Sequence, residues 1–180
     1  MKKTASYISM GNGRFFLIFL IIILNFFILN TLLYSQSYQV RAYTEDDGLA
    51  SPEVFDITQD FSGRIWFATR NGVTVYDGSN WKTYGTARGL PPGVYQEIKC
   101  DGKGTIWAFS TFSSIIIAKY DRKGDRWELL PAPVRQYEDR VNSFETAVIN
   151  DETVLAVGMK GLGLYLWTGN SWKVFNSQKD

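Results

Sequence analysis

The sequence of 180 residues contains no histidine, and Cys100 is its only cysteine. Without histidine, the chain has no Ser-His-Asp or Cys-His nucleophile arrangement and no histidine-based zinc or iron site. A single cysteine forms no disulfide within the chain, and a lone thiol is more often buried and inert than nucleophilic. The sequence therefore predicts no catalytic residue, no metal site and no cofactor.

A pair of carboxylates is the remaining route to hydrolytic chemistry. The candidates are Asp46, Asp47, Glu53, Glu138 and Asp139. We interpret Asp46-Asp47-Gly48 and Glu138-Asp139 as solvated loop charges rather than as a catalytic pair.

Acidic residues are missing from the N-terminal part of the chain, since none precedes Glu45. Lys2, Lys3 and Arg14 lie before residue 38, and without these three of the 19 basic residues the remainder of the chain holds 16 basic and 18 acidic residues. Binding to nucleic-acid phosphates needs a concentrated positive face. The sequence shows none, so we expect no nucleic-acid partner.

Residues 1–37 combine a basic head, an apolar run over 15–29 and a small-residue tail at 35–37. This order is typical of a secretory signal peptide, cut within the tail. An uncleaved membrane anchor is the alternative, because a run extended to Leu33 nearly reaches the roughly 20 residues that span a bilayer. In both cases residues from 38 onward are expected in the periplasm or outside the cell.

Beyond residue 37, short runs of β-branched and aromatic residues alternate with Gly, Asp and Asn. The 12 Phe, 10 Tyr and 6 Trp favour strands, and no segment shows the apolar spacing of a helix. In the first unit we expect strands over 54–60, 64–69, 73–76 and 81–84. Asn71-Gly72 and Asp77-Gly78 fit the tight turns between them.

Parts of this unit recur along the chain. Gly48-Leu49 returns as Gly89-Leu90, and Asp60-x-x-Gly63-x-Ile65-Trp66 returns as Asp101-x-x-Gly104-x-Ile106-Trp107. A closing tryptophan ends each unit, at Trp81, Trp127 and Trp172. In the third unit residues 154–157 replace the Ile-Trp strand. The chain therefore holds three copies of one four-stranded unit.

A repeated, four-stranded antiparallel unit of about 43 residues is typical of a β-propeller blade. We predict an all-β fold with about three such blades of an incomplete ring, preceded by a hydrophobic N-terminal helix, the signal peptide. The predicted parts are 1–37 (signal peptide or signal anchor) and 38–180 (partial propeller), the latter divided into 38–46 (lone outer strand), 47–86 (blade one), 87–131 (blade two) and 132–180 (blade three). Propellers close with roughly four to eight blades. We therefore expect either a piece of a longer protein or homo-oligomers that complete a ring through exposed edge strands.

The motifs resemble the two-component regulator propeller repeat, found in the sensor regions of bacterial signalling proteins. The residues that carry this resemblance are Asp47-Gly48-Leu49, the segment from Gln59 to Trp66, Ala68-Thr69, Gly72-Val73 and Tyr76-Asp77-Gly78. The resemblance covers residues 38–180 and is strongest in the first unit. Ala68 stands where the family prefers glycine, and Lys99-Cys100 where it usually has Gln-Asp.

The resemblance implies a periplasmic propeller, often followed by an Ig-like domain, a membrane span and a cytoplasmic histidine kinase or diguanylate cyclase. None of those later domains lies in these 180 residues. We therefore expect an extracytoplasmic, non-catalytic sensor for an unknown small-molecule or oligosaccharide signal. Two alternatives are a secreted propeller-based carbohydrate-active enzyme and a surface-assembly protein that closes its ring by oligomerising.

Two sets of residues are candidates for defined roles. Aromatic residues that repeat from unit to unit are expected to pack between blades, whereas a ligand platform needs aromatics that differ between units. Tyr95, Phe112 and Tyr137 fit that second description and are the candidate ligand-binding residues, with core packing as the alternative for Tyr95 and Tyr137. The structural repeat positions are Asp60, Gly63, Trp66, Trp81, Asp101, Gly104, Trp107, Trp127 and Trp172.

Asp60 and Asp101 each stand three residues before a glycine. This spacing suggests calcium, but it lacks the multiple oxygen ligands of a loop such as the EF-hand. We expect both carboxylates to accept hydrogen bonds from backbone amides of their turns instead.

Overall fold

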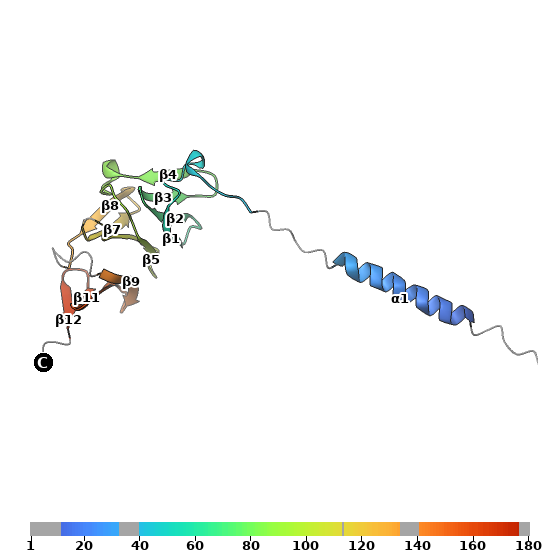
Figure 1. Cartoon of the computed structure of the whole chain (residues 1–180). Coiled ribbons are helices and arrows are strands. Elements are labelled where there is room, and N and C mark those ends of the chain that lie inside the picture. The colour runs from blue at the N-terminus through green and yellow to red at the C-terminus, as the bar shows by residue number, and fades with distance from the viewer. Residues whose placement is uncertain (1–11, 33–39, 113, 134–140, 177–180) are drawn as a thin grey trace, which may run out of the picture. The chain divides into compact units, whose positions relative to one another are not determined.

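The computed structural model describes residues 12–32, 40–112, 114–133 and 141–176 (Figure 1). In these ranges it contains one α-helix and three four-stranded antiparallel sheets. The chain divides into two compact units, residues 1–41 and 42–180, and each is described by itself. The predicted all-β fold with a hydrophobic N-terminal helix is confirmed.

Helix α1 spans Asn12–Leu32. The side chains of residues 15–24 and of Phe26 are exposed, and Asn25 donates a hydrogen bond from Nδ2 to the carbonyl of Ile21 at 2.9 Å. Within the described part of the chain, no helix combines the length and the apolar character needed to cross a membrane. Cleavage of this segment as a signal peptide stays a prediction.

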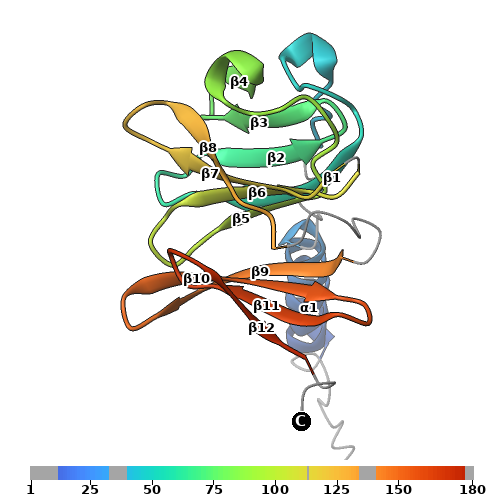
Figure 2. The ribbon, with the colours of Figure 1, turned by 90° about the vertical axis from the view of Figure 1, so that its left-hand side faces the viewer.

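Three sheets form the second unit, and we name them blade one, blade two and blade three in chain order. Blade one contains β1 (Val54–Gln59), β2 (Ile65–Thr69), β3 (Gly72–Tyr76) and β4 (Trp81–Tyr84). Blade two contains β5 (Glu97–Cys100), β6 (Ile106–Ser110), β7 (Ile116–Asp121) and β8 (Arg126–Leu130). Blade three contains β9 (Val141–Ile149), β10 (Glu152–Met159), β11 (Gly163–Trp167) and β12 (Trp172–Phe175). Each strand pairs with its chain neighbour, and Figure 2 shows blade two between the other blades.

Two short 3₁₀ helices, Glu45–Asp47 and Thr86–Arg88, precede blades one and two. Each ends at a glycine with positive φ, Gly48 at 117° and Gly89 at 81°. A Cβ on Gly48 would stand 2.5 Å from the Cβ of Trp81, and one on Gly89 would stand 2.3 Å from the carbonyl oxygen of Trp127. The repeated Gly-Leu pair therefore lets the chain turn directly against the closing tryptophan of its own blade.

The predicted lone outer strand over 38–46 is not found in the described residues of that range. Residues 40–44 have no strand structure, and Glu45–Asp47 is helical. A strand needs a hydrogen-bonded neighbour, and this segment belongs to none of the three sheets. Instead, Tyr43 packs on blade one, with its ring centroid 5.3 Å from that of Trp81 and 5.6 Å from that of Tyr76.

Blade three departs from the other two at its first hairpin. Asn150 and Asp151 form the turn with φ of 49° and 62°, which suits a two-residue hairpin with two left-handed positions. β9 and β10 have nine and eight residues, against six and five in β1 and β2. The strand pair is longer because this turn replaces the five-residue turn of the other blades. That turn spans 60–64 in blade one and 101–105 in blade two, and we call it the aspartate turn because it begins with Asp60 or Asp101.

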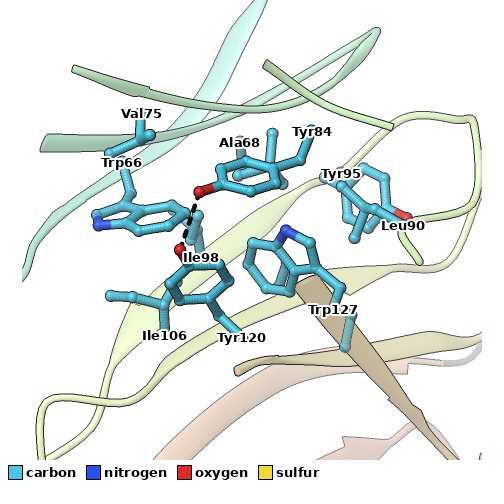
Figure 3. Close-up of a cluster of buried hydrophobic side chains, with 13 residues drawn as sticks. Trp66, Ala68, Val75, Tyr84, Leu90, Tyr95, Ile98, Ile106, Tyr120 and Trp127 are labelled. Carbon is cyan, nitrogen blue, oxygen red and sulfur yellow. Dashed lines mark hydrogen bonds between the residues drawn. The ribbon is translucent and has the colours of Figure 1, made fainter. Parts of the chain in front are cut away.

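Neighbouring blades pack face to face through two buried clusters. Junction one lies between blades one and two and is rich in aromatic rings (Figure 3). Its residues are Trp66, Ala68, Val73, Val75, Tyr84, Leu90, Tyr95, Ile98, Ile106, Ala108, Ala118, Tyr120 and Trp127. Junction two lies between blades two and three and consists of Trp107, Phe109, Ile115, Ile117, Phe144, Leu155, Val157, Met159 and Tyr165.

Three of the tryptophans at repeated positions are buried between blades, while Trp172 packs half-buried against junction two. Trp66 and Trp127 are buried in junction one, with ring centroids 5.9 Å apart, and Trp107 is buried in junction two. Trp81 lies on the opposite face of blade one, because it pairs with Tyr76 while Trp66 pairs with Val75, and faces alternate along a strand. Trp81 is therefore only half-buried.

Candidate functional site

The aspartate turns place two carboxylates beside buried indoles. In blade one, Asp60 Oδ1 accepts hydrogen bonds from the backbone N–H groups of Ser62 at 2.8 Å and Arg64 at 3.0 Å. Its Oδ2 accepts from Trp66 Nε1 at 3.1 Å and from Arg64 Nε at 2.7 Å. The expected bonds to turn amides are present. Gly63 closes the turn with φ of +81°, which favours glycine.

Asp101 repeats this arrangement in blade two, with one difference. Its Oδ1 accepts from the backbone N–H groups of Lys103 and Thr105, each at 2.9 Å. Its Oδ2 accepts from Trp107 Nε1 at 2.9 Å and from Thr153 Oγ1 at 2.9 Å. Thr153 belongs to blade three. Asp101 therefore links two blades, whereas the hydrogen bonds of Asp60 to described residues stay within blade one.

Both carboxylates are held in their ionised form. Burial opposes ionisation, but the hydrogen bonds from the Trp66 indole and from Arg64 hold the pKa of Asp60 below its usual range. Asp101 is buried too, and hydrogen bonds from Trp107 and the turn amides hold its pKa below the usual range. Within the described residues, no group of three or more Asp, Glu or Cys side chains is arranged to hold a metal ion.

The other titratable candidates have structural surroundings. Asp46 is exposed, and the carboxylate of Asp47 accepts the backbone N–H of Thr44 at 2.9 Å. Glu53 pairs with Arg70 at 2.8 Å, and residues 138–139 lie outside the described residues. Cys100 is half-buried rather than buried, and burial raises the pKa of its thiol.

The strands of each blade connect at two ends. We call the end with the turns at 60–64, 101–105, 122–125, 150–151 and 168–171 the turn end, and the opposite end the loop end. Tyr95 and Phe112 belong to segments of the loop end, since they follow β4 and β6.

Of the three predicted ligand residues, one is buried, one is exposed and one lies outside the described residues. Tyr95 is fully buried in junction one, and its hydroxyl donates to the carbonyl of Pro91 at 2.8 Å. Tyr95 therefore packs in the core, which is the alternative predicted for this residue, and its ring leaves no face for a ligand in this structure. Figure 3 shows Tyr95 beside Leu90 in junction one. Phe112 is 70% exposed. Tyr137 lies outside the described residues.

Two neighbouring cavities open at the turn end. The first, of about 390 Å³, covers the turn end of blade two and reaches Arg64 of blade one. The second, of about 530 Å³, lies between blades two and three and is lined in part by Trp107 and Trp167. Lys103, Thr105, Lys119 and Glu128 line both. We call the first cavity the basic groove.

Positive charge dominates the basic groove. Five of its lining residues are cationic and two are anionic. Both anionic residues pair with Arg126, which does not line the groove. Asp121 Oδ2 lies 3.7 Å from Arg126 Nε, and Glu128 Oε1 lies 3.6 Å from Arg126 Nη2. The cationic residues are Arg64, Lys103, Lys119, Arg122 and Lys123.

Residues 48–71 match the family described as two component regulator propeller. A relative called histidine kinase P4, from Formosa agariphila, is 31% identical over 67 residues, which is 37% of this chain and 5% of the kinase.

Two solved structures from B. thetaiotaomicron share the fold of this chain. One is the extracellular domain of the one-component system BT4673, with a TM-score of 0.61 and 16% identity over 82% of this chain. The other is the extracellular domain of the hybrid two-component system BT3049, with a TM-score of 0.62 and 20% identity over 79% of this chain. The chain spans 20% and 21% of these two structures.

The repeat pattern in the sequence does not predict the basic groove. Its cations come from three different turns and from β7, and no two of them stand at positions that repeat between blades. Arg122 reaches the turn of blade one, where its Nη2 donates to Ser62 Oγ across 60 residues of sequence. Only the packing of blade on blade brings these side chains together.

Proposed function

We propose that residues 42–176 form part of an extracytoplasmic sensor module of a bacterial two-component-type signalling protein, which recognises a ligand and performs no catalysis itself. One observation carries this proposal: the residues that match the regulator propeller repeat lie in a fold shared with the extracellular domains of two bacterial signalling systems. The relative named as a histidine kinase supports the same role.

The order of the segments supports an extracytoplasmic position. A basic head and the apolar helix α1 precede the blades, as in an exported protein. A reporter enzyme that is active only outside the cytoplasm, fused after residue 176, tests this position. We expect activity from the full fusion and none when residues 1–37 are removed. Equal activity from both fusions would contradict export by this segment.

The outer face of blade one indicates where further propeller sequence would pack. Phe55 and Ile57 are exposed there, and Trp81 is half-buried at the position that is fully covered in Trp127 of blade two. Blade two covers its equivalent face with blade one. We therefore propose that a further blade covers this face, in a longer chain that closes the ring.

Removing the blades from the chromosomal gene tests the sensor proposal. An in-frame deletion of codons 42–176 in the source bacterium is expected to abolish the transcriptional response to one class of compound. A strain with Lys160→Ala, an exposed lysine of the β10–β11 turn, is the matched control and keeps the response. A deletion strain that responds normally but no longer cleaves a polysaccharide would favour the secreted-enzyme alternative.

A further inference from the structure

We propose that the basic groove binds the acidic group of an anionic ligand: a carboxylate, sulfate or phosphate. The inference rests on the proposed sensor function for its biological meaning and names the chemistry of the signal. The groove lies at the turn end, away from the loop-end residues Tyr95 and Phe112.

The central residue of this site is Lys119. It is half-buried and lines both cavities. Its partner in the β7–β8 register is Glu128, but that carboxylate lies beside Arg126 at 3.6 Å. Among the described residues, no carboxylate oxygen lies within 4 Å of Lys119 Nζ. This ammonium group makes a cation–π contact with Trp107, 5.9 Å from the ring centroid. A partly desolvated cation without a carboxylate favours an anion from solution.

Two more cationic side chains border the groove without a carboxylate partner among the described residues. In the described residues, neither Arg122 nor Lys123 has a carboxylate within ion-pair distance of its side chain. Arg122 is instead tied to Ser62 of blade one through Oγ. This neutral hydroxyl holds the guanidinium at the groove without cancelling its charge, so its remaining N–H groups can donate to an oxyanion.

The other two cations are already paired. Arg64 Nε lies 2.7 Å from Asp60 Oδ2, and Lys103 Nζ lies 3.1 Å from Asp151 Oδ1. Each of these two cations is therefore balanced by a carboxylate. The net positive charge at the site therefore comes from three side chains, Lys119, Arg122 and Lys123.

An exposed aromatic ring borders the charges. Phe61, in the aspartate turn of blade one, is 72% exposed. A Cβ on Gly104 would stand 2.9 Å from Phe61 Cδ2, so the ring rests against the backbone of a groove-lining residue. An apolar ring face beside cations suits a ligand with an apolar surface and an acidic group, as in an acidic sugar.

The test uses the full chain labelled with ¹⁵N. The indole N–H signals serve as local probes, with Trp107 beside Lys119 and Trp81 on the far face of blade one as the internal reference. The titrants are inorganic sulfate, D-glucuronate and neutral glucose at constant ionic strength. We expect sulfate and glucuronate to shift the Trp107 signal in a saturable way, and glucose to leave it in place.

Three variants decide the outcome. Lys119→Gln keeps most of the stem over Trp107 and is expected to weaken both acids about tenfold, since it removes a charged hydrogen bond. Lys160→Ala removes one positive charge at the loop end and is expected to change nothing. Phe61→Ala separates the two sources: weaker glucuronate with unchanged sulfate indicates an acidic sugar, and no effect on either indicates a simple oxyanion.

The inference is overturned if neither acid shifts Trp107, if glucose binds as well as glucuronate, or if Lys119→Gln and Lys160→Ala titrate alike. Any of these results leaves the gene-deletion experiment unaffected. Failure of the anion site and failure of the sensor function are therefore distinguishable.

Discussion

The two junctions between blades use the same repeated positions but different chemistry. Junction one contains the mutually packed rings of Trp66, Tyr84, Tyr120 and Trp127, with centroids 4.9 to 5.9 Å apart. In junction two, Phe109 and Phe144 stack at 4.8 Å, and aliphatic residues fill most of the remainder. The repeat therefore fixes where blades meet but not which side chains hold them together.

Polar links across the junctions differ as well. At junction one, Asp125 of blade two accepts hydrogen bonds from the Tyr84 and Tyr120 hydroxyls, each at 2.9 Å, and pairs with Lys82 and Arg88. At junction two, the links are the hydrogen bond from Thr153 to Asp101 and the ion pair of Lys103 with Asp151. Asp60 makes no such link, because Arg64 contacts the oxygen that Asp101 offers to the next blade. The same repeated aspartate thus bonds across one junction and, among the described residues, not across the other.

The largest effect is expected from Trp66→Ala in junction one. Trp66 is fully buried, so the truncation leaves a cavity and lowers the free energy of unfolding by about 3 to 5 kcal/mol. Trp81→Ala removes the same side chain from a half-buried position. We expect it to lower the free energy of unfolding clearly less than Trp66→Ala does. Chemical denaturation of both variants measures the difference. Equal losses would show that burial in the junction does not set the contribution of these indoles.

A pair of Trp→Phe changes compares a buried indole that donates a hydrogen bond with one that does not. Trp107→Phe removes the donor to the buried Asp101 carboxylate and is expected to cost about 1 to 3 kcal/mol more than loss of ring area alone. Trp127→Phe is the matched control, because Trp127 Nε1 has no hydrogen-bond partner among the described residues. Denaturation of both variants at neutral pH gives the comparison.

The same pair has a pH dependence of known sign. The pKa of Asp101 in the folded chain lies below its ordinary value of 3.8, so its stabilisation is present above that value and is lost as pH falls through the lower folded pKa. Trp107→Phe raises the folded pKa toward the ordinary value. The loss of unfolding free energy caused by Trp107→Phe should therefore be smaller at about pH 3 than at neutral pH. The loss caused by Trp127→Phe should be the same at both pH values. A deficit that does not depend on pH would contradict the role of Asp101.

A smaller effect is expected from Asp125→Asn. Asparagine accepts the left-handed φ of 51° at this position, so the change removes charge without strain. Hydrogen bonding to Lys82 holds the pKa of Asp125 well below its usual range. Because the side chain is about one-third exposed, we expect a loss of about 1 kcal/mol or less.

Salt is the sharper readout for Asp125. Screening weakens pairs of partly exposed charges, so the difference between Asp125→Asn and the unmodified chain should narrow in thermal unfolding at high salt. Glu53→Gln, which breaks the exposed pair with Arg70 inside blade one, is the control and is expected to have a smaller effect. A loss from Asp125→Asn that is unchanged by salt would show that hydrogen-bond geometry, not charge, links the blades there.

Much of the fold followed from the residues themselves. The strand Trp81–Tyr84 has the predicted bounds, and the three strands before it agree within one residue at each end. Alternating apolar and polar residues, with glycine at left-handed turn positions such as Gly63, carry that information locally. The bonds of Asp60 and Asp101 to turn amides are local as well, since donor and acceptor lie two to four residues apart.

The sequence by itself determined the four-stranded unit, its three copies and the absence of histidine chemistry, because strand pairing between chain neighbours and residue composition need no distant contact. Only the tertiary structure decided that Tyr95 is buried, that Asp101 bonds to Thr153, and that Arg122 and Lys119 border one groove. These facts depend on how one sheet packs on the next. Side chains separated by 50 or 60 residues come together only after that packing, and no local pattern records it.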